Sequence, residues 1–131
     1  MNKESEERER RKFQRLNAAF TLTYRINHPL SLRMSVGWDV GVSAVMVDLS
    51  EDGMAFATDY DIPIGTIISM RFTLINLDAQ GDERVESMRI SGEVKSNVFV
   101  ARKEHRLGIK FTQIEEKDKT AITNFLRYRK E

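Results

Sequence analysis

The sequence contains no cysteine, which excludes disulfide bonds, thiolate metal sites and cysteine nucleophiles together. It also has no apolar run approaching the roughly 18 residues of a membrane span, and its first residues lack the apolar core of a signal peptide. We therefore expect a soluble, cytoplasmic protein. The formal net charge is only +1, so any site for an anion must come from local clustering of basic residues.

Sequence signatures of catalysis and of metal binding are also missing. The chain has no phosphate-binding P-loop, no Gly-x-Ser-x-Gly and no His-Glu-x-x-His. Its two histidines, His28 and His105, have no second ligand at metal spacing and are interpreted as turn or surface residues. The sequence thus predicts no catalytic residue, no metal site and no enzyme activity.

The length of 131 residues fits one domain, and the charge pattern divides its N-terminal part. Ten of the thirteen residues from 3 to 15 are charged, a composition that cannot be buried in a core. We expect a flexible charged arm over residues 1–9 and a folded domain over residues 10–131. Acidic residues dominate the start of this charged segment, and basic residues follow at its end: Arg10, Arg11, Lys12 and Arg15.

The rest of the chain alternates between apolar and polar residues, which is typical of half-buried strands. This alternation predicts six or seven short strands, at roughly 20–26, 30–36, 42–49, 54–58, 68–74, 87–99 and 105–112. A polar loop is expected over 76–86. Apolar residues at helical spacing near 121–126 predict a final amphipathic helix, with Thr112 and Glu115 at the spacing of a capping box. Repeated short strands with turns between them favour a sandwich or a barrel.

Two local patterns are candidates for a binding site. The first is Arg11 and Arg15 in an Arg-x-x-x-Arg, with Arg10 directly before it. A four-residue offset places two guanidinium groups on one face of a helix or an extended chain, and such groups bind phosphates and guanine edges in bidentate fashion. By itself, the pattern also fits an ordinary solvated run of charge.

The second pattern is the segment Asp48-Leu49-Ser50-Glu51-Asp52-Gly53, which follows an apolar run. As a plain turn, it would use Asp48 or Ser50 to bond the local backbone and Gly53 to supply a positive φ. As a binding site, it would offer the Asp48 carboxylate to the two donors on the Watson–Crick edge of guanine, with Ser50 adding a hydroxyl. Gly53 would then let the backbone approach the ligand.

Taken together, the two patterns are more specific than either alone. An Arg-x-x-x-Arg followed, after one or two strands, by Asp-x-Ser-x-x-Gly resembles the PilZ domain family. Gly65 before an alternating strand, the segments 92–94 and 107–111, and the terminal helix are similar to that family's pattern as well, so the resemblance covers roughly residues 10–128.

The resemblance implies a fold, a ligand and a set of binding residues. PilZ domains are all-β proteins, with a six-stranded antiparallel β-barrel and a C-terminal α-helix, and they act as receptors for cyclic di-GMP. Arg11 and Arg15 would then bind the phosphates and guanine faces, while Asp48, Ser50 and Gly53 would hold a guanine on the barrel. An arginine at the position of Arg10 tends, in this family, to accompany an intercalated pair of ligand molecules.

The same resemblance implies an adaptor that passes the signal to an unidentified protein effector in motility, pilus or exopolysaccharide control. The segment 31–41 makes the span between the two motifs longer than is usual, and its Trp38 either packs on the barrel or stacks on a base. Two other functions stay open: a nucleic-acid-binding β-barrel that uses the basic arm, and a PilZ-like module that binds protein without ligand.

Overall fold

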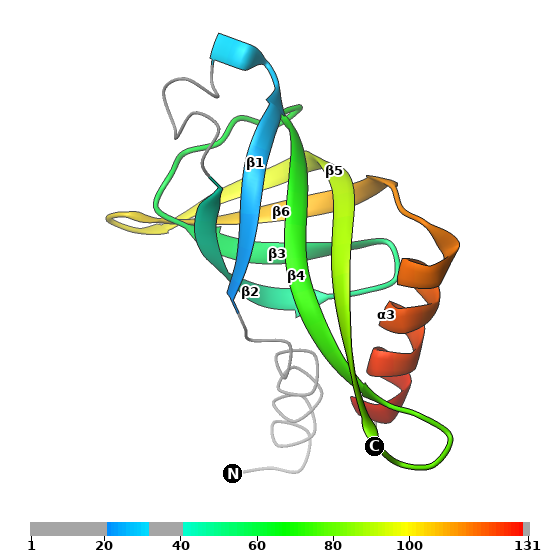
Figure 1. Ribbon diagram of the computed structural model, residues 1–131. Coiled ribbons are helices and arrows are strands. Elements are labelled where there is room, and N and C mark those ends of the chain that lie inside the picture. Colours follow the sequence, from blue (N-terminus) through cyan, green and yellow to red (C-terminus); the bar gives the residue numbers. More distant parts are fainter. Residues whose placement is uncertain (1–20, 32–40, 130–131) are drawn as a thin grey trace, which may run out of the picture.

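The structure is a computed structural model that describes residues 21–31 and 41–129. In this part of the chain six strands precede one long helix (Figure 1). They are β1 (Thr21–His28), β2 (Val42–Leu49), β3 (Gly53–Thr58), β4 (Ile67–Leu77), β5 (Glu83–Ala101), β6 (Glu104–Gln113) and α3 (Glu116–Arg129).

The strands form a closed barrel in the order β1-β2-β3-β6-β5-β4, and β4 pairs back to β1. Every pairing is antiparallel. The 19-residue β5 pairs with β4 along its first half and with β6 along its second half. It therefore links two hairpins that extend beyond the ring at opposite ends (Figure 1). The expected six-stranded antiparallel barrel with a C-terminal helix is confirmed.

The barrel core consists of the residues that the alternating pattern points inward. Leu22, Tyr24 and Ile26 of β1 are buried while their neighbours are more exposed, and the same alternation runs through β4. The Tyr24 hydroxyl lies 2.7 Å from the Thr58 hydroxyl, so the polar end of this buried ring has a hydrogen-bond partner. Burial raises the pKa of Tyr24 to about 12, against the opposing effect of that hydrogen bond.

The helix α3 packs its apolar side, with Ala121, Ile122 and Phe125, into the same core. The side-chain amide of Asn76 in β4 donates to the backbone oxygen of Ala121 at 3.0 Å and to Glu86 Oε2 at 2.7 Å. These bonds tie the helix to β4 and to β5. The predicted helical face is therefore correct.

Three local predictions were wrong. The expected loop over 76–86 is shorter because β4 runs to Leu77 and β5 begins at Glu83. Thr112 does not cap the helix, since it lies in β6, and the backbone oxygen of Glu115 accepts the first helical N–H bonds instead. Leu30 and Ser31 are helical rather than extended, and the rest of the predicted 30–36 strand, like Trp38, lies outside the described residues.

Candidate functional site

The turn between β2 and β3 is closed by hydrogen bonds between its first and last residues. The backbone N–H of Ser50 donates to the backbone oxygen of Gly53 at 2.8 Å. The Ser50 hydroxyl accepts from the N–H of Gly53 at 3.1 Å and donates to the oxygen of the same residue at 3.1 Å. Ser50 therefore fixes the shape of the turn in the way that the plain-turn interpretation expects.

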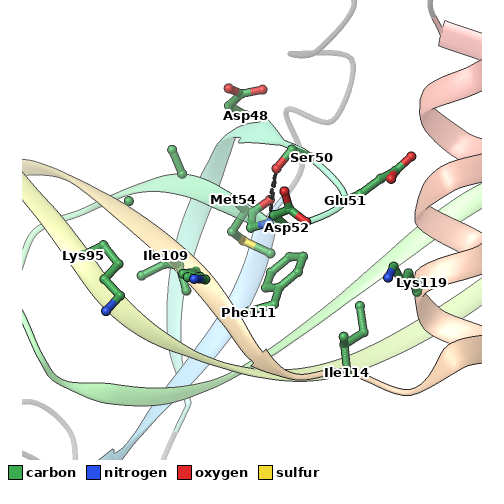
Figure 2. A pocket seen from close by; sticks show the side chains of 14 residues that line it. Asp48, Ser50, Glu51, Asp52, Met54, Lys95, Ile109, Phe111, Ile114 and Lys119 are labelled. Atoms are coloured by element: carbon green, nitrogen blue, oxygen red, sulfur yellow. Dashed lines mark hydrogen bonds between the residues drawn. The ribbon is translucent and has the colours of Figure 1, made fainter.

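Asp48 is placed by an irregularity in β2. The pairing of β2 with β3 shifts register between Met46 and Asp48, and such a bulge changes the direction of the side chains that follow it. Asp48 Oδ1 accepts the backbone N–H of Leu49 at 2.9 Å. The half-buried carboxylate is thus oriented by its own backbone, on the same side of the barrel as the turn (Figure 2).

Gly53 is required for a different reason from the one that the sequence suggested. Among the described glycines only Gly65 and Gly81 have positive φ, so the expected positive φ at Gly53 is wrong. A Cβ at Gly53 would overlap the backbone oxygen of Ile109 and would lie 3.3 Å from the Cα of Lys110. The glycine is needed because β3 approaches β6 closely at this point.

The turn is also bonded to β6 through the neighbouring residue. The backbone N–H of Phe111 donates to the oxygen of Asp52 at 2.8 Å, and Gly53 pairs with Lys110 in the register of β3 and β6. The position of the turn is therefore set by the barrel as well as by its own bonds.

A groove of about 690 Å³ lies beside this turn, between β2–β3, β5–β6 and the start of α3 (Figure 2). Its floor includes the largely buried Met54, Ile109 and Phe111. The charged residues that line it are three acids and three lysines: Asp48, Glu51, Asp52, Lys95, Lys110 and Lys119. Small-ligand sites commonly combine such a volume with an apolar floor and a few polar groups.

The structure brings together one of the two predicted motifs. Asp48, Ser50 and Gly53 all line the groove. Arg10, Arg11 and Arg15 lie outside the described residues.

The three groove lysines were missed by the sequence analysis. Lys110 belongs to the alternating segment 107–111, where it is one of the polar positions, and nothing in that pattern relates it to Gly53. Only the register of β3 and β6 makes the two residues neighbours. Lys95 and Lys119 reach the groove from β5 and α3, which no local motif connects to the turn.

The histidines of the described segments do not form a site. His105 Nδ1 lies 3.1 Å from Asn97 Oδ1, and its ring packs edge-on against Phe99. No cluster of three or more potential metal ligands occurs within residues 21–31 and 41–129. In the same part of the chain no helix combines the length and the apolar character needed to cross a membrane.

Comparisons with known proteins agree with this arrangement of strands and helix. No curated protein matches the sequence significantly. The structure is similar to that of a Bacillus subtilis inhibitor of motility (MotI/DgrA), with a TM-score of 0.64 and 11% identity over 86% of this chain. The match covers 47% of that protein, so the present chain spans about half its length.

A second similar structure is the PilZ domain of CeSA from a cellulose synthesizing bacterium, with a TM-score of 0.50 and 13% identity. It covers 87% of this chain and 95% of the other. At such identities, both likenesses concern the fold. The sequence itself matches the PilZ domain over residues 9–128. This chain therefore belongs to the PilZ domain family.

Proposed function

We propose that this protein is a cyclic di-GMP receptor that works as an adaptor and has no catalytic step. One side of the binding site would be the groove beside Asp48, Ser50 and Gly53. The other side would be Arg10, Arg11 and Arg15 in the basic block that ends the charged segment 3–15, and this whole charged segment is called the arm below. Membership of the PilZ family, whose members are receptors for this ligand, supports the proposal. The alternative of a nucleic-acid-binding barrel has no comparable support.

The observation that carries the proposal is the fixed turn on the rim of the groove. Ser50 and Gly53 hold each other by three hydrogen bonds, and β6 holds the turn through Phe111. A carboxylate that is already oriented loses little conformational entropy on binding a guanine edge. Asp48, whose Oδ1 accepts the Leu49 N–H, has this property.

The arm would supply most of the positive charge for the ligand's two phosphates. Arginine binds phosphate in bidentate fashion and stacks on bases, so three arginines within six residues suit a ligand with two phosphates and two guanines. Binding would reorder the arm against the barrel, and a protein effector would read the changed surface. The cytoplasm is the proposed location, because the ligand is an intracellular messenger.

Isothermal titration calorimetry with cyclic di-GMP tests the proposal directly. We expect wild-type protein to bind and the Arg11→Ala and Arg15→Ala variants to lose detectable binding. Arg84→Ala is the matched control, because Arg84 is an exposed arginine of β5 that does not line the groove. Unchanged affinity in both arm variants would refute the proposal.

The stoichiometry of the same titration tests the role of Arg10. An intercalated pair predicts two ligand molecules per chain for the wild type and one for Arg10→Ala, with binding retained. A wild-type value of one would remove the pair from the proposal. Salt-sensitive binding of a polynucleotide without any response to cyclic di-GMP would favour the nucleic-acid alternative.

The effector is identified only by class. One similar structure comes from an inhibitor of motility and the other from a cellulose synthesizing bacterium, and both are too distant to choose between those pathways. A pull-down with and without cyclic di-GMP would show whether a protein binds in a ligand-dependent way.

A further inference from the structure

The formal charges that line the groove cancel, with three acids against three lysines. A phosphate bound there would meet the repulsion of Glu51 and Asp52, which lie on the turn itself (Figure 2). Its position therefore depends on which of the lysines are available to bind it. The three lysines differ clearly in this respect.

Lys95 is already paired. Its Nζ lies 3.0 Å from Glu93 Oε2, two residues away on the same strand. Glu93 also lies opposite Lys110 in the register of β5 and β6, so its carboxylate has two lysines as neighbours but binds Lys95. Lys110 makes no ion pair with any residue of the described segments, although it lies beside Glu93.

Lys110 is also the lysine nearest to the motif along the sheet. It pairs directly with Gly53, and partners in an antiparallel pair have Cα atoms only about 4.5–5.5 Å apart. A lysine side chain is long enough to reach an anion held beside the turn. Its ammonium group is then a donor that is not committed to any carboxylate of residues 21–31 and 41–129.

Lys119 approaches the groove from the other side. It lies in the first turns of α3, and its side chain points toward the groove (Figure 2). It also has no ion pair within the described part of the chain. Lys117, two residues earlier on the helix, is 3.8 Å from Glu115 and does not line the groove. Residues two apart on a helix point to different faces, so Lys117 is a matched control.

We propose that Lys110 and Lys119 together bind phosphate groups of the ligand from the barrel side, which makes α3 part of the binding site. This inference rests on the proposed function and adds two residues that lie outside both sequence motifs. It also gives the ligand a direct contact with the helix that closes the barrel core. Lys95 stays with Glu93 and contributes little.

The test is calorimetry with cyclic di-GMP on the full chain, at about 50 mM and about 300 mM salt. Lys110→Gln and Lys119→Gln are each expected to weaken binding about tenfold at low salt, as the loss of a charge-assisted hydrogen bond predicts. Both should also reduce the salt dependence of the affinity. Lys117→Gln should bind within about twofold of wild type, and Lys110→Arg should retain most of the affinity because it keeps the charge.

The outcomes separate this inference from the proposed function. If either glutamine variant binds within about twofold of wild type while Arg11→Ala loses binding, the inference fails and the receptor function stands. If the wild type does not bind cyclic di-GMP, the proposed function fails and the inference fails with it. Thermal melting of each variant checks folding, and the charge-preserving Lys110→Arg separates loss of charge from a structural effect at that position.

Discussion

Replacing Gly53 by alanine separates the structural role of the motif glycine from its proposed role in binding. The new methyl group would overlap the backbone oxygen of Ile109, and it would lie 3.1 Å from that residue's carbonyl carbon. Both atoms belong to the backbone of β6, which is paired on both sides, so neither can move away by a side-chain rotation. The variant must therefore separate β3 from β6 at this point.

The size of the effect follows from what that separation breaks. Forced overpacking typically costs about 1–3 kcal/mol. The bonds at risk are the one from Phe111 N–H to the Asp52 oxygen and the one from Ser50 N–H to the Gly53 oxygen, each with a net contribution of about 1 kcal/mol. We expect Gly53→Ala to lower the free energy of unfolding by about 3 kcal/mol and the melting temperature by about 10 °C.

Urea unfolding of ligand-free protein measures this change, with Gly81→Ala as the control. Gly81 has a φ of 85° and no atom within 4 Å of the place that a Cβ would take, so alanine there meets only backbone strain of roughly 1–2 kcal/mol. If Gly53→Ala unfolds like the wild type, the close approach of β3 to β6 does not constrain this position. If the effect is as large as expected, loss of ligand binding in this variant says little about a ligand contact, and Asp48→Ala is the better probe.

Further predictions concern the core and the helix. Tyr24→Phe should cost about 1–2 kcal/mol, and chemical unfolding measures this, because it leaves the largely buried Thr58 hydroxyl with only the long 3.4 Å bond from the Tyr60 N–H. Since the pKa of Tyr24 is raised to about 12, the native state keeps a proton that the unfolded state loses from pH 10 upward. The free energy of unfolding should therefore fall between pH 10 and pH 12, and it should fall less steeply in Tyr24→Phe. Burial raises the pKa of Asp118 above its ordinary value of 3.8, so the stability that this carboxyl contributes in its protonated form is lost as the pH rises above 3.8. Asp118→Asn should remove this loss, as melting curves in the acid range would show. Phe99→Ser should cost only about 1 kcal/mol or less, since the ring is 67% exposed and loses mainly its edge contact with His105. Phe56→Ala, by contrast, should cost about 3–5 kcal/mol, as paired unfolding curves would show.

The strands could be predicted from the sequence because the barrel buries one face of each of them. The period-two alternation at 21–26 and 68–74 reflects that half-burial directly, and the same holds for the apolar stripe of α3. The ends of β4 and β5 could not be predicted in this way. Asn76 is a polar residue at an inward position, and the partners that satisfy it, Glu86 and the Ala121 oxygen, are distant in sequence. From the sequence alone, a polar residue of this kind predicts a loop.

The candidate site likewise contains residues that a local motif predicts and residues that only the tertiary structure brings to it. Asp48 and Ser50 could be predicted because a turn motif is local, and each makes the kind of backbone bond that its residue type favours. The need for Gly53 was predicted for the wrong reason, since the constraint comes from Ile109 on another strand rather than from a local φ. Lys110 and Lys119 could not be found at all, because register and helix docking bring them to the groove.

The hydrogen bonds of the turn also assign different roles to its three motif residues. The Ser50 hydroxyl already accepts one bond and donates one to Gly53, which leaves a single lone pair for a ligand. Gly53 is held against β6 by close packing. Both residues therefore act first as a scaffold that exists without ligand. Under the proposed function, recognition of a guanine edge would then depend mainly on Asp48, whose carboxylate this scaffold and the β2 bulge hold in place. On that proposal, the motif would combine one recognition group with the residues that keep it oriented, so its presence supports the geometry of a site more directly than it supports the affinity.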